Sequence, residues 1–199
     1  MHLAKSLLCG VALLALPLAA DAATYKINKP HTMATYRIRH FVSNVEGRFD
    51  GIDGTIQFDP KNAPASNVEF TVDAKSVNSG NPNRDNDLRG PGFFDTDRCP
   101  TLTFKSTKVA VKDASHYDVT GDLTMRCVTK QVTVPVEYLG TQKFPDGKEK
   151  AGFETEFTVD RKDYGINWNQ TLDQGGVMLG DDVKIHIAVE ADLATPAAK

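Results

Sequence analysis

The acidic and amide side chains of residues 81–87 resemble a ligand set for a metal ion. Asn81, Asn83, Asp85 and Asp87 alternate along the chain, as the oxygen ligands of a calcium loop do. The glycine at the sixth position of such a loop and the glutamate that closes it are both missing. The five histidines are isolated, with no pair at the spacing of zinc ligands. We therefore expect a solvated loop at residues 81–87 and no metal site.

The motifs of common catalytic sites are also missing. The sequence contains no G-x-S-x-G nucleophile turn, no H-E-x-x-H metalloprotease helix and no G-x-G-x-x-G or phosphate-binding loop. The acidic pair Asp181-Asp182 lies at an expected turn and needs no catalytic role. The sequence thus favours a binding protein over an enzyme and indicates no cofactor.

Composition narrows the class of partner. The chain has 199 residues, 40% of them hydrophobic, and a formal net charge of −3. Its isoelectric point near 5.9 argues against a nucleic-acid-binding protein, which would carry a basic face.

The first 22 residues have the pattern of a secretory signal peptide. Lys5 precedes an uncharged apolar run over residues 7–20, and Ala20-Asp21-Ala22 has the small-x-small form of a cleavage site. A membrane anchor is the alternative, but the run is too short to span a bilayer and contains Pro17. We expect residues 1–22 to be removed and residues 23–199 to form one periplasmic or secreted domain.

Two cysteines remain in that domain, Cys99 and Cys127, and export favours a disulfide between them. A hairpin of residues 101–109 and 117–125 would place the two opposite each other. However, the apolar alternation of this hairpin favours a register shifted by one residue, which would put the sulfurs on opposite faces. Pro100 could relieve the conflict by ending the strand. Two buried free thiols are the alternative.

The elements that must position any site are almost all strands. Apolar and polar residues alternate over residues 36–39, 55–58, 68–73, 131–137, 153–159 and 183–190, in addition to the hairpin. Each such strand has one apolar and one polar face, which is typical of antiparallel sheets. About eight strands separated by Gly, Pro and Asn turns predict a sandwich or a closed barrel.

Residues 76–98 interrupt this pattern with a polar, Gly- and Asn-rich stretch. Residues 84–89 could form a short helix that Gly90-Pro91 ends, and Phe93-Phe94 follow. The insertion is either a surface loop whose phenylalanines plug the core or a cap over one end of a barrel.

A barrel of eight strands encloses either packed side chains or one small ligand. The strand alternation places an aromatic and aliphatic set on the inward face, which suits a long apolar ligand. His40 lies at the end of its strand, on the same face as Tyr36 and Ile38. It therefore either meets a polar head group at the mouth of the barrel or is a hydrogen-bonded interior histidine. The inward set is Tyr36, Ile38, Phe58, Val68, Phe70, Phe104, Leu123, Phe153 and Phe157.

Ordered motifs along residues 25–190 resemble the YceI-like family of polyisoprenoid-binding, lipocalin-like periplasmic proteins. They include Arg84-Asp85-x-x-Leu88-Arg89, Phe93-Phe94-Asp95, the run from Pro100 to Thr107, and the run from Arg161 to Ile166. The resemblance implies an all-β protein: an eight-stranded antiparallel barrel with a long pore, a short helical cap and a buried isoprenoid-like amphiphile.

Two departures from the family pattern affect the expected ligand and the cysteines. Asp87 stands where the family commonly has His, which weakens recognition of a phosphate head group and favours a neutral head such as a quinone. Cys127 stands where the family usually has Gly, which fits a disulfide specific to this branch.

The sequence therefore predicts an exported, non-enzymatic carrier of an isoprenoid lipid, with the polar residues His40, Arg84 and Arg89 at the mouth. The expected form is a monomer or a homodimer, for which transient membrane contact is possible. An enzyme acting on such a lipid and a packed-barrel stress or interaction protein are the alternatives. The expected ligand-binding residues are Tyr36, Ile38, His40, Phe49, Phe58, Phe70, Arg84, Asp87, Leu88, Arg89, Phe93, Phe94, Phe104, Leu123, Phe153, Phe157 and Trp168.

Overall fold

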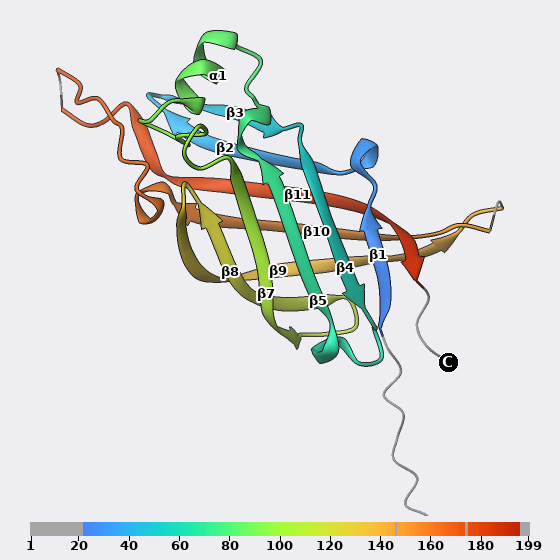
Figure 1. Cartoon of the computed structure of the whole chain (residues 1–199). Helices are drawn as coiled ribbons and strands as arrows, with labels where there is room; N and C mark the ends of the chain where they lie inside the picture. Colours follow the sequence, from blue (N-terminus) through green and yellow to red (C-terminus); the bar gives the residue numbers. More distant parts are fainter. Residues whose placement is uncertain (1–21, 146, 174, 196–199) are drawn as a thin grey trace, which may run out of the picture.

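The computed structural model describes residues 22–145, 147–173 and 175–195, which form an antiparallel barrel with one short helix (Figure 1). The predicted signal peptide, apart from Ala22, lies outside the described residues. The strands are β1 (Ala23–Ile27), β2 (Met33–His40), β3 (Ser43–Phe49), β4 (Ile52–Phe58), β5 (Asn67–Asp73), β6 (Val77–Asn78), β7 (Thr101–Val111), β8 (His116–Met125), β9 (Val128–Lys143), β10 (Glu149–Asp160) and β11 (Leu179–Thr195), and the helix is α1 (Pro82–Arg89).

Eight of these strands close the barrel. The hydrogen-bonded order runs β1-β4-β5-β7-β8-β9-β10-β11, and β11 pairs back with β1. All the neighbouring pairs are antiparallel. The predicted eight-stranded antiparallel barrel with a helical insertion is therefore confirmed.

Strand β11 is long enough to pair with two strands on the same side. Residues 191–195 pair with β1, whereas residues 179–188 pair with β2. Strands β3 and β6 then extend the sheet beyond β2. This arrangement adds a flap of three strands beside the barrel, at the end that carries α1 (Figure 1).

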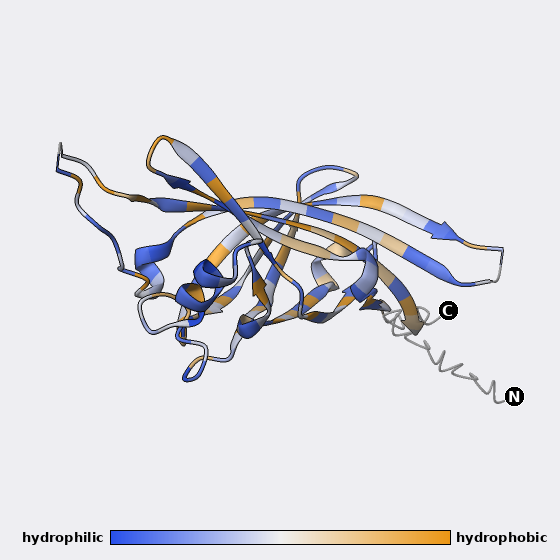
Figure 2. Cartoon of the chain, turned by 90° about the horizontal axis from the view of Figure 1, so that it is seen from above, coloured by the Kyte–Doolittle hydropathy of each residue, from blue (hydrophilic) through white to orange (hydrophobic). Residues whose placement is uncertain are grey.

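The alternation of residue types matches the observed strands, as the bands of colour along them show (Figure 2). Side chains on the inward face gather in three apolar clusters. One surrounds Phe58 and Phe153, a second surrounds Phe49 and Phe70, and a third surrounds Leu123 and Tyr164. Phe104 contacts all three clusters, so they line one continuous interior.

The disulfide between Cys99 and Cys127 is present, with the two Cα atoms 5.4 Å apart. The register near it is the one that the apolar alternation favours, since Phe104 lies opposite Leu123. Both cysteines lie outside the strands, because β7 begins at Thr101 and β8 ends at Met125. The expected conflict between sulfur placement and strand register is resolved in this way.

The insertion before β7 forms the cap. The Asn81 side chain accepts hydrogen bonds from the backbone N–H groups of Asn83 and Arg84 and thereby begins α1. The Asp85 carboxylate is buried and accepts from Ser79 at both N and Oγ. No group of three His, Cys, Asp or Glu side chains suited to a metal ion occurs in the described residues.

The described helices include none with the length and apolar character needed to cross a membrane.

Candidate functional site

A cavity of about 880 Å³ occupies the barrel interior. This volume lies toward the upper end of the range of about 300–1,000 Å³ that is typical of small-molecule sites. It is lined by residues of β2, β3, β4, β5, β7, β8, β9, β10 and β11, together with α1 and the loops beside it. Alternation along these strands therefore produces one large apolar space instead of a filled core.

Aromatic side chains close the inner end of this cavity. The Phe58 ring lies edge-on to Tyr117 and Phe153, at centroid distances of 5.5 and 5.3 Å. It also contacts Tyr138, at 4.8 Å. All of these rings belong to, or pack against, the first apolar cluster. The result is a floor built from packed aromatic rings.

The other end of the cavity is polar and partly exposed. Asn83 and Asp87 of α1 line it and are exposed, and Trp168, which is 42% exposed, lines it from the loop before β11. The Phe93 ring lies 5.3 Å from the Trp168 ring, and the Phe94 ring lies 5.4 Å from the Phe49 ring. Phe93 and Phe94 therefore join the cap to the barrel while also lining the cavity.

Most of the expected ligand-binding residues line this cavity. They are Tyr36, Ile38, His40, Phe49, Phe58, Phe70, Arg84, Asp87, Leu88, Phe93, Phe94, Phe104, Leu123, Phe153, Phe157 and Trp168. Arg89 does not belong to the lining. Its guanidinium donates to the carbonyls of Lys75 and Val77, so it holds α1 on the preceding segment.

The charged groups of α1 balance one another. The helix carries Arg84 and Arg89 against Asp85 and Asp87. The Arg84 guanidinium donates to the hydroxyl and the carbonyl of Ser79, both at 2.8 Å. Helix α1 therefore carries no net formal charge.

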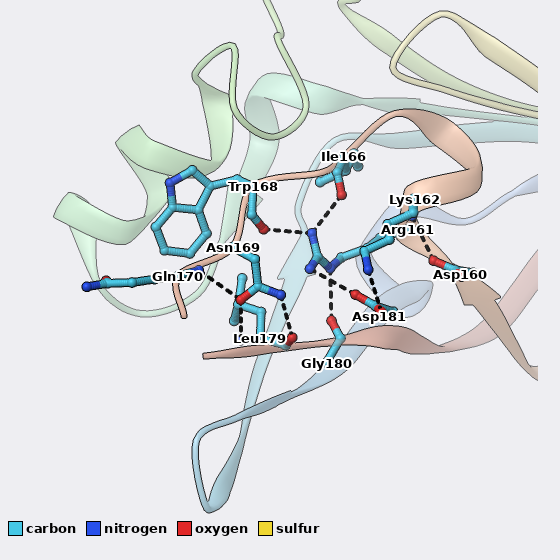
Figure 3. A network of polar contacts seen from close by, with 10 residues as sticks. All are labelled: Asp160, Arg161, Lys162, Ile166, Trp168, Asn169, Gln170, Leu179, Gly180 and Asp181. Carbon is cyan, nitrogen blue, oxygen red and sulfur yellow. Dashed lines mark hydrogen bonds and ion pairs between the residues drawn. The ribbon is translucent and has the colours of Figure 1, made fainter. Parts of the chain in front are cut away.

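Sequence reasoning did not identify Arg161, which lines the cavity and is only 3% exposed. Its guanidinium donates to the carbonyls of Gly180, Ile166 and Trp168 and to the Asp181 carboxylate, at 2.6–3.1 Å (Figure 3). This network fixes the Trp168 backbone at the mouth. The run from Arg161 to Ile166 among the family motifs was the only sequence signal for it.

A second group of lining residues was also missed. Val183, Ile185, Ile187 and Val189 of β11 face the cavity. Their strict alternation indicated a strand with an apolar face, and the same parity argument that selected Tyr36 could have placed them in the lining.

Tyr36 combines a lining position with an unpartnered hydroxyl. Its ring packs over Gly47, where a Cβ atom would collide with it. The hydroxyl is buried and has no hydrogen-bond partner among the described residues. Burial raises the pKa of Tyr36 to about 12, with a smaller opposing effect from Arg84, so the group remains protonated.

Because an unpaired buried hydroxyl costs free energy, we expect Tyr36→Phe to raise the free energy of unfolding by about 1 kcal/mol. Tyr25→Phe is the matched control, since the buried Tyr25 donates to Glu149 Oε1 at 3.0 Å and should lose about 1 kcal/mol. Urea unfolding of the three proteins measures both effects. Equal destabilisation by the two substitutions would show that the Tyr36 hydroxyl has a partner in solution.

Known proteins resemble this chain over most of its length. The model of the YceI-like domain matches residues 25–191. The chain belongs to the YceI-like family. A UPF0312 protein of Pectobacterium atrosepticum is 39% identical to this member over 186 residues, which cover 92% of this chain and 93% of the relative.

Solved structures share the fold of this YceI-like protein. Burkholderia cenocepacia BcnA superposes with a TM-score of 0.74 at 23% identity, covering 83% of this chain and 99% of BcnA. A polyisoprenoid binding domain from Saccharophagus degradans, implicated in plant cell wall breakdown, superposes with a TM-score of 0.63 at 16% identity. The superposition covers 86% of this chain and 99% of that domain. At these identities the likeness concerns the fold.

Proposed function

We propose that this protein is an exported carrier that holds an isoprenoid lipid in the barrel cavity. The observation that carries the proposal is the apolar cavity of about 880 Å³, with an aromatic floor at one end and a polar, partly exposed mouth at the other. A long hydrocarbon tail fits such a space, and each buried CH₂ contributes about 0.8 kcal/mol to binding.

The mouth favours a neutral head group of the quinone type. Of the charged side chains of α1, only Arg84 and Asp87 line this end, and their opposite charges cancel, so the helix offers no net attraction to a phosphate. His40, Arg84 and the amides of Asn83 and Asn86 line this end and can donate hydrogen bonds to a carbonyl oxygen.

Further support comes from the structural relatives and from the sequence. The similar domain from Saccharophagus degradans is described as polyisoprenoid binding. Family membership and the apolar lining both favour a binding protein over an enzyme. The signal-peptide pattern of residues 1–22 supports export to the periplasm or the medium.

Organic-solvent extraction of the purified protein followed by mass spectrometry tests the proposal, together with uptake of added ubiquinone. We expect an isoprenoid lipid in the extract or saturable uptake of about one ubiquinone per chain. A protein that yields no lipid and takes up no ubiquinone would contradict the proposed function.

A substitution in the middle of the cavity should abolish this binding. Val189 lines the cavity and contacts two of the three apolar clusters, so Val189→Phe should fill the space that a tail requires. We expect ubiquinone uptake to decline at least about tenfold, with little loss of stability, because the added ring enters an existing cavity. Ala188→Phe, at the adjacent position that does not line the cavity, is the control and should bind normally. Normal uptake by Val189→Phe would place the ligand elsewhere.

A further inference from the structure

Large apolar side chains are exposed around the mouth of the cavity. Phe41 and Val42 form the turn between β2 and β3 and are 40% and 94% exposed. Trp168 and Val177 lie in the loop before β11 and are 42% and 53% exposed. We refer to these four residues as the mouth rim.

Backbone hydrogen bonds join the two parts of the mouth rim. His40 pairs with Leu179, and the Phe41 N–H donates to the Met178 carbonyl at 2.8 Å. The Met178 N–H in turn donates to the Gln170 carbonyl at 2.9 Å. The turn and the loop therefore form one continuous edge, and both project at the same end of the barrel (Figure 1).

The Asn169 side chain fastens the loop further. Its Oδ1 accepts from the Leu179 N–H at 3.0 Å and its Nδ2 donates to the Leu179 carbonyl at 2.9 Å (Figure 3). The mouth rim is thus held in place by ordered contacts, which lowers the entropic cost of any surface it binds.

The mouth rim is continuous with the cavity. Ile38, His40, Trp168 and Met178 line the cavity, whereas Phe41, Val42 and Val177 do not. An apolar ligand that enters or leaves at this end therefore passes directly beside exposed apolar side chains.

The rim segments also lack charge. Residues 164–180 contain a single acidic or basic residue, Asp173, and residues 40–45 contain none apart from His40. In the chain as a whole, 25% of residues are charged. Aromatic side chains are enriched at membrane–water interfaces, and the scarcity of charge beside Trp168 and Phe41 avoids the cost of desolvating charged groups there.

We propose that the mouth rim inserts into the surface of a phospholipid bilayer and opens the cavity toward the lipid. This inference rests on the proposed function, since a carrier of a membrane-soluble ligand must meet the membrane. A lipid surface fits better than a protein partner, because the rim segments carry almost no charge and border the opening of an apolar cavity.

Flotation with phosphatidylcholine vesicles tests this proposal. Trp168 is the only tryptophan in the chain, so its emission reports on the rim without interference. We expect the protein to float with the vesicles in low and high salt, its Trp168 emission to shift to the blue, and brominated phosphatidylcholine to quench that emission. Absence of flotation, or flotation that disappears at high salt, would overturn the proposal, because apolar insertion is not screened by salt.

Paired substitutions identify the rim as the contact. Val42→Asp with Val177→Asp places charges on two rim residues that do not line the cavity, and should lower the vesicle-bound fraction at least about tenfold. Val111→Asp with Leu139→Asp is the matched control, since these residues are 55% and 57% exposed and lie in β7 and β9, away from the rim. An equal loss of vesicle binding in both double variants would overturn the proposal. Light scattering that shows two copies of the chain associating through the rim would also overturn it.

Ubiquinone uptake separates this proposal from the proposed function. The rim variant should take up ubiquinone diluted from ethanol to the same final level as the wild type, but should load more slowly from ubiquinone-containing vesicles. If the wild type floats but takes up no ubiquinone from either source, the membrane contact stands and the carrier function fails. If the rim variant loads from vesicles as fast as the wild type, the proposed role of the rim in lipid transfer fails.

Discussion

Arg161→Ala should lower the free energy of unfolding by about 3 kcal/mol, because it removes the guanidinium that donates to three backbone carbonyls, and each of these hydrogen bonds contributes about 1 kcal/mol. The guanidinium is 3% exposed, so water does not readily replace its hydrogen bonds. Urea unfolding of wild type and variant measures the difference.

The same substitution should disturb the mouth. The Arg161 guanidinium holds the Trp168 carbonyl at 2.8 Å, and the loop from Ile166 to Gly180 depends on this contact at both ends (Figure 3). We expect the Trp168 emission of Arg161→Ala to shift to the red in conditions where the protein remains folded. Arg161→Lys should retain only part of the free energy of unfolding that Arg161→Ala loses, since an ammonium group cannot reproduce the forked geometry of the guanidinium.

Lys162→Ala is the control for this experiment. Lys162 pairs with the same Asp181 carboxylate at 2.7 Å, but its side chain is 47% exposed. Exposed ion pairs contribute about 0–1 kcal/mol, so this substitution should have little effect. If Arg161→Ala is no more destabilising than Lys162→Ala, the buried network does not hold the loop.

Residue alternation was sufficient to predict eight of the strands and the aromatic lining, but it did not indicate β1, β3 or β6. Phe58, Phe104 and Phe153 share the inward parity of their strands, and all three line the cavity. The barrel itself, with its cap, followed from the family motifs. The double pairing of β11 with β1 and β2 could not be predicted, because it depends on where the barrel closes and not on any local pattern.

The polar end of the site was harder to predict for the same reason. Arg161 is buried by carbonyls that lie 5–19 residues away along the chain, so nothing adjacent to it in sequence indicates its burial. Arg89 was expected at the mouth with Arg84, but it donates to the carbonyls of Lys75 and Val77, outside the cavity lining. Side chains of the same type on one short helix thus take different roles according to the backbone they meet.

Removal of the disulfide should lower the free energy of unfolding by about 3–4 kcal/mol, since the loop that it closes spans 28 residues. Cys99 is 2% exposed and ends the capping insertion, whereas Cys127 lies in the turn between β8 and β9. The bond therefore fastens the cap to the barrel. Urea unfolding of Cys99→Ala/Cys127→Ala against the oxidised wild type measures its contribution.

The turn at Cys127 allows a sharper version of this experiment. Arg126 and Cys127 have φ angles of 49° and 60°, the left-handed conformation that two-residue hairpin turns require and that glycine adopts most readily. Cys99→Ala/Cys127→Gly also removes the disulfide, but glycine has no Cβ atom and adopts the left-handed conformation without steric cost. We therefore expect it to be more stable than Cys99→Ala/Cys127→Ala by about 1 kcal/mol.

Arg126 helps to determine how the cap responds to loss of the bond. Its guanidinium donates to the carbonyls of Gly165 and Pro91, at 2.5 and 2.8 Å, so the same turn holds both sides of the mouth. These contacts remain in both cysteine variants. Limited proteolysis should accordingly cut within residues 79–98 faster in either variant than in the wild type, while the barrel stays intact. Unchanged cleavage would mean that Arg126 and the apolar contacts of Phe93 and Phe94 hold the cap without the disulfide.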